Sequence, residues 1–194
     1  MNILQHIGFL LRITGSHGIM RRYFVVNGFD GALTMLGLML GFLLSAPTEL
    51  SVVISACLGA AIALGVSGVS SAYISEGAER RRALTRLEEA MITDLQESAH
   101  GKATRWVPML IALVNGLAPF LISMLILLPL WLAKAGLILP IAPLYAAIGM
   151  ALILIFLLGV FLGQIERVSW VVSGIKTLLV ALVTVVLIVL FASA

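Results

Sequence analysis

Five long apolar stretches, separated by shorter polar segments, dominate the pattern of this 194-residue chain. A bilayer core of about 30 Å needs roughly 20 apolar residues per helix, and each stretch is long enough to cross it. The pattern therefore predicts an all-α, polytopic membrane protein with five transmembrane helices. The predicted spans cover residues 24–45, 50–74, 106–131, 143–163 and 169–191.

The polar segments divide the chain into four parts. Residues 1–22 repeat apolar positions at helical spacing, which predicts an amphipathic interfacial helix at the N-terminus. Residues 23–75 hold the first two spans, and residues 106–194 hold the last three. Segment 76–105 is rich in Glu, Arg, Ala and Leu, which are strong helix formers, so we expect a helical insert there. The second span can run directly into this insert, and Gly101 is expected to end its helix.

Composition agrees with a membrane protein and excludes both a soluble globular domain and a disordered chain. Hydrophobic residues make up 61% of the sequence and charged residues 11%, which leaves too little polar surface to cover a soluble core. Segment 76–105 holds more charged residues than the rest of the chain together. The net charge of +3 follows this topology, so no nucleic-acid partner is expected. The single cysteine, Cys57, excludes a disulfide within the chain.

Basic residues outside the spans predict how the protein is oriented. Ten Lys and Arg residues lie on the side of the N-terminus and of segment 76–105, whereas Lys134 alone lies on the other side. We therefore expect an integral membrane protein whose N-terminus and insert are cytoplasmic. Five spans then place the C-terminus on the extracytoplasmic or lumenal side.

Ionisable residues within spans point to function because lipid disfavours them strongly. Two occur here, Asp30 and Lys176. Asn27, Asp30 and Thr34 share one face of the first span, and their amide, carboxylate and hydroxyl oxygens suit a divalent cation. The alternative is a structural ion pair between Asp30 and Lys176, which their depth and charge permit.

Asn115 in the third span is a further candidate ligand. Pro119 lacks the N–H that the Asn115 carbonyl would accept in a regular helix, so this oxygen is free to bind a cation. A simple kink at the proline is the alternative.

The second span carries a stripe of small residues at every fourth position. Such a stripe predicts close packing against another helix, and the face of the first span that bears Gly37 and Gly41 is a candidate partner. The stripe consists of Ser55, Gly59, Ala63, Ser67 and Ser71.

The insert offers a second group of candidate metal ligands. If the insert is helical, Asp94, Glu97 and His100 share a face, and a Glu-x-x-His pair can present a carboxylate and an imidazole to one metal. A solvated, charge-rich helix gives the same spacings without binding metal, so both interpretations stay open. The acidic candidates are Glu76, Glu79, Glu88, Glu89, Asp94 and Glu97.

An enzyme is not expected. His6, His17 and His100 are scattered, and no nucleophilic Ser or Cys motif lies near them. Asp30 has no second carboxylate in the spans for two-metal chemistry.

Several motifs, in order along the chain, resemble the vacuolar iron transporter family. Asp30-Gly31-x-x-Thr34 is close to that family's Arg…Gly-x-x-Asp-Gly-x-x-Thr opening. The end of the second span resembles its A-x-S-M-x-x-G-E-Y-x-S-x-x-A-E stretch, and the end of the chain resembles its Leu-Gly…Trp-x-x-Ser-Gly finish. The similarity covers roughly residues 21–190. The later matches are Ser67, Tyr73, Ser75, Ala78, Glu79, Pro119, Gly159, Trp170, Ser173 and Gly174.

The resemblance implies a homodimeric transporter of Fe²⁺, and often Mn²⁺, that exchanges the metal for protons along a path between subunits. The metal is cargo, and no permanently bound cofactor is implied. A glutamate-rich cytoplasmic helix would collect metal, with Glu79, Glu88 and Glu89 as the nearest equivalents and Met91 as a sulfur ligand. The chain departs from the family at Gly68, where the family has Met, and at Ala72, where it often has Glu.

The sequence thus predicts an exporter of a divalent metal from the cytoplasm, with Asp30 as the central ligand and the proton-coupled group. Its expected partners are the bilayer, the metal, protons and a second copy of the chain. The alternative is a non-transporting membrane scaffold or metal-sensing homologue that kept the fold.

Overall fold

Five α-helices and no strands make up the part of the chain that the computed structural model describes, which is residues 16–45, 49–138, 140–166 and 168–192. All five helices are long and apolar enough to cross a membrane, which confirms the predicted all-α, five-span architecture. In chain order they are α2 (Ser16–Leu44), α3 (Leu50–Met91), α4 (Ala99–Lys134), α5 (Pro143–Glu166) and α6 (Trp170–Ala192).

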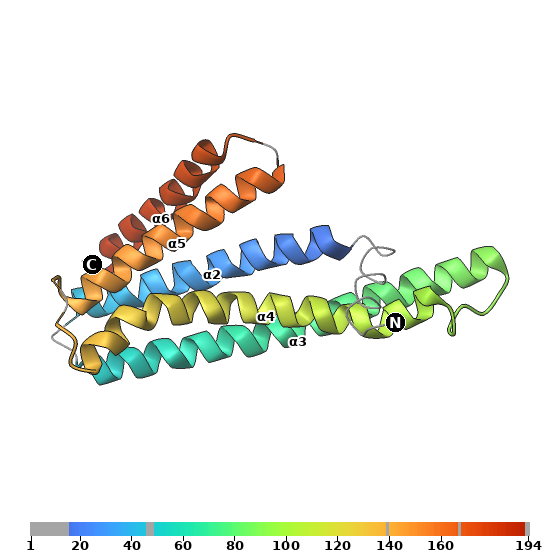
Figure 1. The fold of residues 1–194 in the computed structure, drawn as a ribbon, viewed down its shortest axis with the longest axis horizontal. Coiled ribbons are helices and arrows are strands. Elements are labelled where there is room, and N and C mark those ends of the chain that lie inside the picture. The colour runs from blue at the N-terminus through green and yellow to red at the C-terminus, as the bar shows by residue number, and fades with distance from the viewer. Residues whose placement is uncertain (1–15, 46–48, 139, 167, 193–194) are drawn as a thin grey trace.

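Helices α3 and α4 are much longer than a bilayer requires. They have 42 and 36 residues, which at 1.5 Å per residue gives about 63 and 54 Å. Both continue past the start of α2 at the same end of the molecule (Figure 1). The prediction that the second span runs on into the polar segment is confirmed, because α3 is continuous to Met91.

The turn between α3 and α4 has clear stop and start signals. Ile92 adopts a left-handed conformation with φ of 51°, and its N–H bonds to the Glu88 carbonyl, which ends α3. Ser98 caps α4 by accepting the N–H of Gly101. The prediction that Gly101 ends a helix is wrong, because Gly101 lies in the first turn of α4. A Cβ on Gly101 would lie 2.1 Å from the Gln96 carbonyl oxygen, so the turn backbone requires glycine there.

The predicted interfacial helix falls mainly on residues 1–15, which lie outside the described residues. Residues 16–22 form the first turns of α2.

Helix α4 is the centre of the bundle, with α2 and α3 packed against it and the α5–α6 hairpin beyond α2 (Figure 1). The apolar core lies where α2, α3, α4 and α5 meet, and its members are buried as the hydrophobic pattern requires. Helix α6 is peripheral, because Gly174 and Ala181 are the only buried residues among those described in this helix. The largest core side chains include Met35, Leu36, Met39, Ile126, Leu127, Leu130 and Ile155.

Glycines set the close approach of α5 and α6. A Cβ on Gly159 would lie 2.2 Å from the Thr177 hydroxyl, and one on Gly163 would lie 2.8 Å from Ser173 Cβ. A Cβ on Gly174 would lie 2.4 Å from the Phe156 ring. The glycines of the Leu-Gly and Trp-x-x-Ser-Gly motifs are therefore packing residues of this hairpin.

The tyrosines and tryptophans mark two levels along the bundle. The chain has three of each, and all lie near the ends of the spans, as is typical of side chains at the membrane–water interface. Tyr23, Tyr73, Trp106 and Trp170 lie toward the end where α3 and α4 extend, and Trp131 and Tyr145 lie toward the other.

Candidate functional site

A chain of hydrogen bonds joins three helices within the membrane part of the protein. Asn27 of α2 donates its side-chain N–H to Asn115 Oδ1 of α4, and Asn115 Nδ2 donates to the Gly68 carbonyl of α3 at 2.8 Å. The same Asn27 nitrogen also donates to the Tyr23 carbonyl at 3.0 Å. Unpaired amides are strongly disfavoured in apolar surroundings, so these bonds fix how α2, α3 and α4 align.

The structure thus brings together two of the predicted path residues, Asn27 and Asn115. Asn115 is buried and uses both polar atoms of its side chain within the chain. Asn27 differs, because its Oδ1 receives no hydrogen bond from any described residue. The Asn27 side chain therefore keeps a free amide oxygen, and its hydrogen bond to Asn115 holds it in place.

Close packing explains the glycine at position 68. A Cβ there would lie 3.0 Å from Gly116 Cα and 3.1 Å from the Asn115 carbonyl oxygen. A methionine would push α3 away from α4 and stretch the bond from Asn115 to the Gly68 carbonyl. Ala72, one turn further along α3, is 4% exposed. The departure at Gly68 thus falls where α3 and α4 touch.

Asp30 lies on the exposed face of α2, away from the core. No described residue donates a hydrogen bond to its carboxylate or forms an ion pair with it; the only ion pair among the described residues joins Arg80 and Glu76. Thr34 donates its hydroxyl to the Asp30 backbone carbonyl at 2.8 Å, which leaves the hydroxyl lone pairs free. Lys176 is exposed on α6 and does not pair with Asp30. The predicted alternative of a structural ion pair is not formed in this chain.

The predicted ligands of the insert do not gather in one chain. Among the described residues, no three His, Cys, Asp or Glu side chains lie close enough to hold a metal ion. The prediction that Asp94, Glu97 and His100 share a helix face is wrong, because Ile92 ends α3 and α4 begins only at Ala99. The exposed candidates are Glu79, Glu89, Met91, Asp94, Glu97 and His100.

Glu88 and Asp94, two acidic candidates of the insert, accept hydrogen bonds within the turn between α3 and α4. Glu88 Oε1 accepts the Leu95 N–H at 3.1 Å, and Asp94 Oδ1 accepts the Gln96 N–H at 2.8 Å. Both carboxylates stabilise the turn between α3 and α4 by accepting backbone N–H groups of the turn itself.

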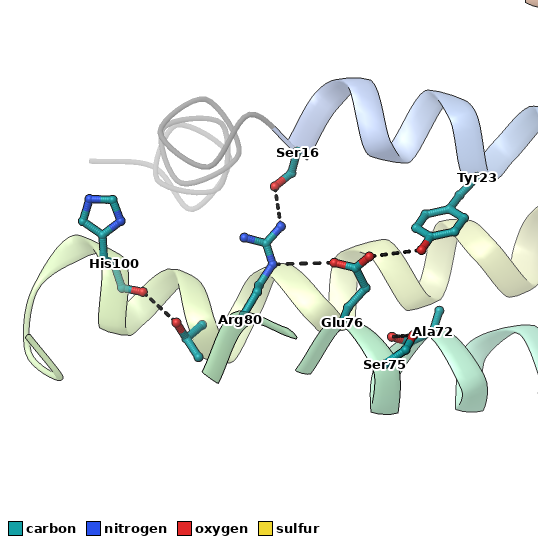
Figure 2. Close-up of polar contacts among 8 residues, drawn as sticks. Ser16, Tyr23, Ala72, Ser75, Glu76, Arg80 and His100 are labelled. Atoms are coloured by element: carbon teal, nitrogen blue, oxygen red, sulfur yellow. Dashed lines mark hydrogen bonds and ion pairs between the residues drawn. The ribbon is translucent and has the colours of Figure 1, made fainter. Parts of the chain in front are cut away.

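A polar network connects the start of α2 to α3 just beyond the span (Figure 2). The Tyr23 hydroxyl donates to Glu76 Oε1 at 3.1 Å, and Arg80 donates to the buried Ser16 hydroxyl at 2.8 Å. Arg80 Nε lies 3.9 Å from Glu76 Oε2, which is an ion pair without a hydrogen bond. Burial lowers the pKa of Arg80, and the Glu76 carboxylate opposes this shift. Arginine remains charged nevertheless, so the network keeps its cation.

Sequence reasoning did not find the roles of Ser16 and Tyr23 in this network. Tyr23 and Glu76 are 53 positions apart, and Ser16 and Arg80 are 64 apart. Only the antiparallel packing of α2 and α3 brings them together.

A comparison with curated proteins finds one informative relative. The chain is 32% identical over 178 residues to the uncharacterized protein MJ0645 of Methanocaldococcus jannaschii, and the match covers 90% of this chain and 88% of the relative. The chain belongs to the same family as MJ0645. No family model and no solved structure matches it. Because the alignment spans nearly all of both chains, the relationship extends over the membrane helices rather than one motif.

In this family member, the predicted small-residue stripe of α3 is not covered by another helix of the chain. Its residues, at positions 55, 59, 63, 67 and 71, are all exposed. The α3–α4 contact uses the neighbouring face instead, where a Cβ on Gly116 would lie 2.3 Å from the Gly65 carbonyl oxygen. The prediction that the stripe packs on Gly37 and Gly41 is wrong for the single chain. A Cβ on Gly41 meets nothing within 4 Å, and one on Gly37 meets Ile188 of α6.

Proposed function

We propose that the protein exports a divalent transition metal, Fe²⁺ or Mn²⁺, from the cytoplasm in exchange for protons. The observation that carries the proposal is the Asp30 carboxylate, which lies within a span and has no partner among the described residues. Such a group is rare in membranes because its charge is strongly disfavoured there. A transported cation would supply the missing partner, in line with the resemblance to vacuolar iron transporters.

The neighbouring oxygens suit a hard or borderline divalent cation. Asn27 Oδ1 is unused, and the Thr34 hydroxyl keeps its lone pairs after donating to the Asp30 carbonyl. Asn115 has a positioning role in this proposal, because it holds the Asn27 amide nitrogen and so directs the amide oxygen. Asp30 holds a proton when no metal is bound, and the metal displaces that proton on binding. This exchange couples metal export to proton entry.

The proposed path lies between two copies of the chain, because one chain offers a single carboxylate within its spans. Asp30 is exposed in the single chain, whereas Met35 on the opposite side of α2 is fully buried. Gly41 has free space where a second helix can approach. Cysteine introduced at Gly41 should therefore cross-link two copies, and cysteine at Met35, the matched control, should not. Cross-linking at Met35 alone would exclude this dimer.

In this proposal the α3–α4 extension faces the cytoplasm. The exposed carboxylates of the extension then act as weak collectors of metal. Two chains would double the carboxylates available there.

Transport by the Asp30→Asn variant is the decisive test. Purified protein in proteoliposomes is assayed for Mn²⁺ uptake with a metal-sensitive dye and for proton movement with a pH-sensitive dye. We expect Asp30→Asn to fold with an unchanged melting temperature and to lose both fluxes. The matched control Lys176→Met should keep them, and adding it to Asp30→Asn should not restore transport.

Three results would count against the proposal. A loss of melting temperature in Asp30→Asn that Lys176→Met repairs, with uptake intact, would identify Asp30 as a structural counter-ion. Metal binding by wild-type protein without any flux would favour the metal-sensing alternative. No binding and no flux would favour the scaffold.

A further inference from the structure

A cavity of about 720 Å³ lies between α3 and α4 where they leave the predicted membrane region. Tyr73 lines it from the α3 side, and Arg105, the neighbour of Trp106, lines it from α4. Tyr73 and Trp106 belong to the level marked by Tyr and Trp side chains at this end of the bundle, so the cavity sits at headgroup depth.

The cavity wall changes character along the bundle. Toward the membrane it is formed by Ile74 and Pro108, and Ile74 is 70% exposed. Toward the extension it is formed by the polar side chains of Arg81, Arg105 and Gln96. A cavity that is apolar at one end and cationic at the other fits a molecule with the same division.

The polar end of the cavity has hydrogen-bond donors that form no ion pair with any described residue. Neither Arg81 nor Arg105 has an ion-pair partner among the described residues. Thr85 and Thr104 also line the cavity, but their hydroxyls already donate to backbone carbonyls of their own helices. Two guanidinium groups are therefore the main donors, and the guanidinium fork matches the oxygens of a phosphate.

One lining group carries the opposite charge. Glu88 Oε1 accepts the Leu95 N–H and stabilises the turn, so this carboxylate already has a hydrogen-bonding role. With two arginines against one glutamate, the charged side chains of the lining have a net positive charge.

We propose that this cavity binds the phosphate of an anionic phospholipid headgroup, with Arg81 and Arg105 as the phosphate ligands and Ile74 and Pro108 beside the first part of the acyl chains. A free phosphate shares the anionic chemistry but not the apolar end, which favours the lipid. The site is independent of metal transport, because none of its residues belongs to the Asp30 face.

The test measures lipid binding to delipidated protein in detergent, by native mass spectrometry and by thermal protection. The ligands are phosphatidylglycerol, phosphatidylcholine and inorganic phosphate at equal concentrations. We expect one phosphatidylglycerol to bind about tenfold more tightly than phosphatidylcholine, whose phosphate is the same but whose choline cation opposes the two guanidinium groups, because contacts between charged groups contribute on that scale. Inorganic phosphate should protect only weakly. Equal protection by inorganic phosphate would overturn the lipid assignment in favour of a soluble anion.

Two double variants distinguish lipid binding in the cavity from attraction by surface charge in general. The double change Arg81→Gln with Arg105→Gln should weaken phosphatidylglycerol binding about tenfold or more. The matched control, Arg82→Gln with Arg86→Gln, removes the same charge from exposed positions of α3 outside the cavity and should change binding less than twofold. Equal losses in the two double variants would show that only diffuse attraction acts, and the proposal would fail.

A third variant blocks the cavity without removing charge. Gly77 lines it, and a Cβ at this position meets nothing within 4 Å, so Gly77→Leu can be accommodated in the fold. It should reduce phosphatidylglycerol binding with all arginines in place. Undiminished binding to Gly77→Leu at a wild-type melting temperature would contradict the proposed location.

Discussion

Gly31 of α2 packs directly against Pro119 of α4: a Cβ on Gly31 would lie 2.7 Å from Pro119 Cα and 2.8 Å from its carbonyl oxygen. This contact holds the two helices close together next to Asp30. The glycine of the Asp30-Gly31 pair therefore has a packing role, and the aspartate beside it is turned to the open face of α2.

We predict that Gly31→Ala destabilises the protein by about 1–3 kcal/mol, because the methyl group meets rigid backbone rather than a flexible side chain. Gly41→Ala, on the same helix but in open space, should leave stability unchanged or raise it slightly. Thermal melting of both variants in detergent measures the difference. Equal melting temperatures would show that α2 and α4 separate easily at this contact.

The Asn27–Asn115 contact yields a prediction about paired changes. Asn115→Leu should cost about 1–3 kcal/mol, because Asn27 loses its Asn115 acceptor and the Gly68 carbonyl loses its Asn115 donor in an apolar setting. Asn27→Leu combined with Asn115→Leu should be less destabilising than the sum of the single changes. A double-mutant cycle of chemical unfolding in mixed micelles measures the coupling, and strict additivity would mean that the two amides do not interact.

Glu88 and Glu89 are neighbours with different surroundings, which separates a structural role from a metal-collecting role. Glu88→Ala should lose about 1 kcal/mol, because the Leu95 N–H loses its acceptor, whereas Glu89→Ala should be neutral. Melting temperatures test this point.

Calorimetric titration with Mn²⁺ tests the metal-collecting role of the same two variants. If the extension collects metal, Glu89→Ala should weaken Mn²⁺ binding without loss of stability. Unchanged affinity in both variants would support a solvated helix that binds no metal.

Membrane topology is predicted from ten basic residues on one side and Lys134 on the other. A reporter fused after Ala194 should be active only if it requires the extracytoplasmic side. A reporter in the 92–98 turn should show the opposite behaviour. Cytoplasmic activity of the C-terminal fusion would contradict the predicted orientation or span number.

The spans and the continuity of α3 could be predicted because both follow from local composition. An apolar run of sufficient length has to satisfy its backbone as a helix in lipid, and Glu, Arg, Ala and Leu extend that helix beyond it. The end of α3 at Ile92 could not be predicted, because the helix-forming composition continues around it. An isoleucine in a left-handed conformation also has no sequence signature. The surrounding turn decides it, through the bonds of Glu88 and Ser98.

The candidate site was predictable only in part. Spacing showed that Asn27, Asp30 and Thr34 share a face, but it could not show that Asn27 meets Asn115 across 88 positions. The stripe on α3 was visible as a pattern, yet the pattern did not say which small residues face α4. Gly65 and Gly68 do so, and both lie against Gly116.

Because α3 is one continuous helix, a movement of its membrane part also moves the part beyond the predicted span. From Ile74 to Met91 the helix projects about 25 Å beyond the predicted span, so a tilt of about 10° within the bilayer shifts its tip by roughly 4 Å. Helix α4 is bonded to α3 through Asn115 and is joined to it again at the Glu88–Leu95 turn. Helices α3 and α4 therefore move together, so that any tilting of these helices within the bilayer also displaces the extension outside it.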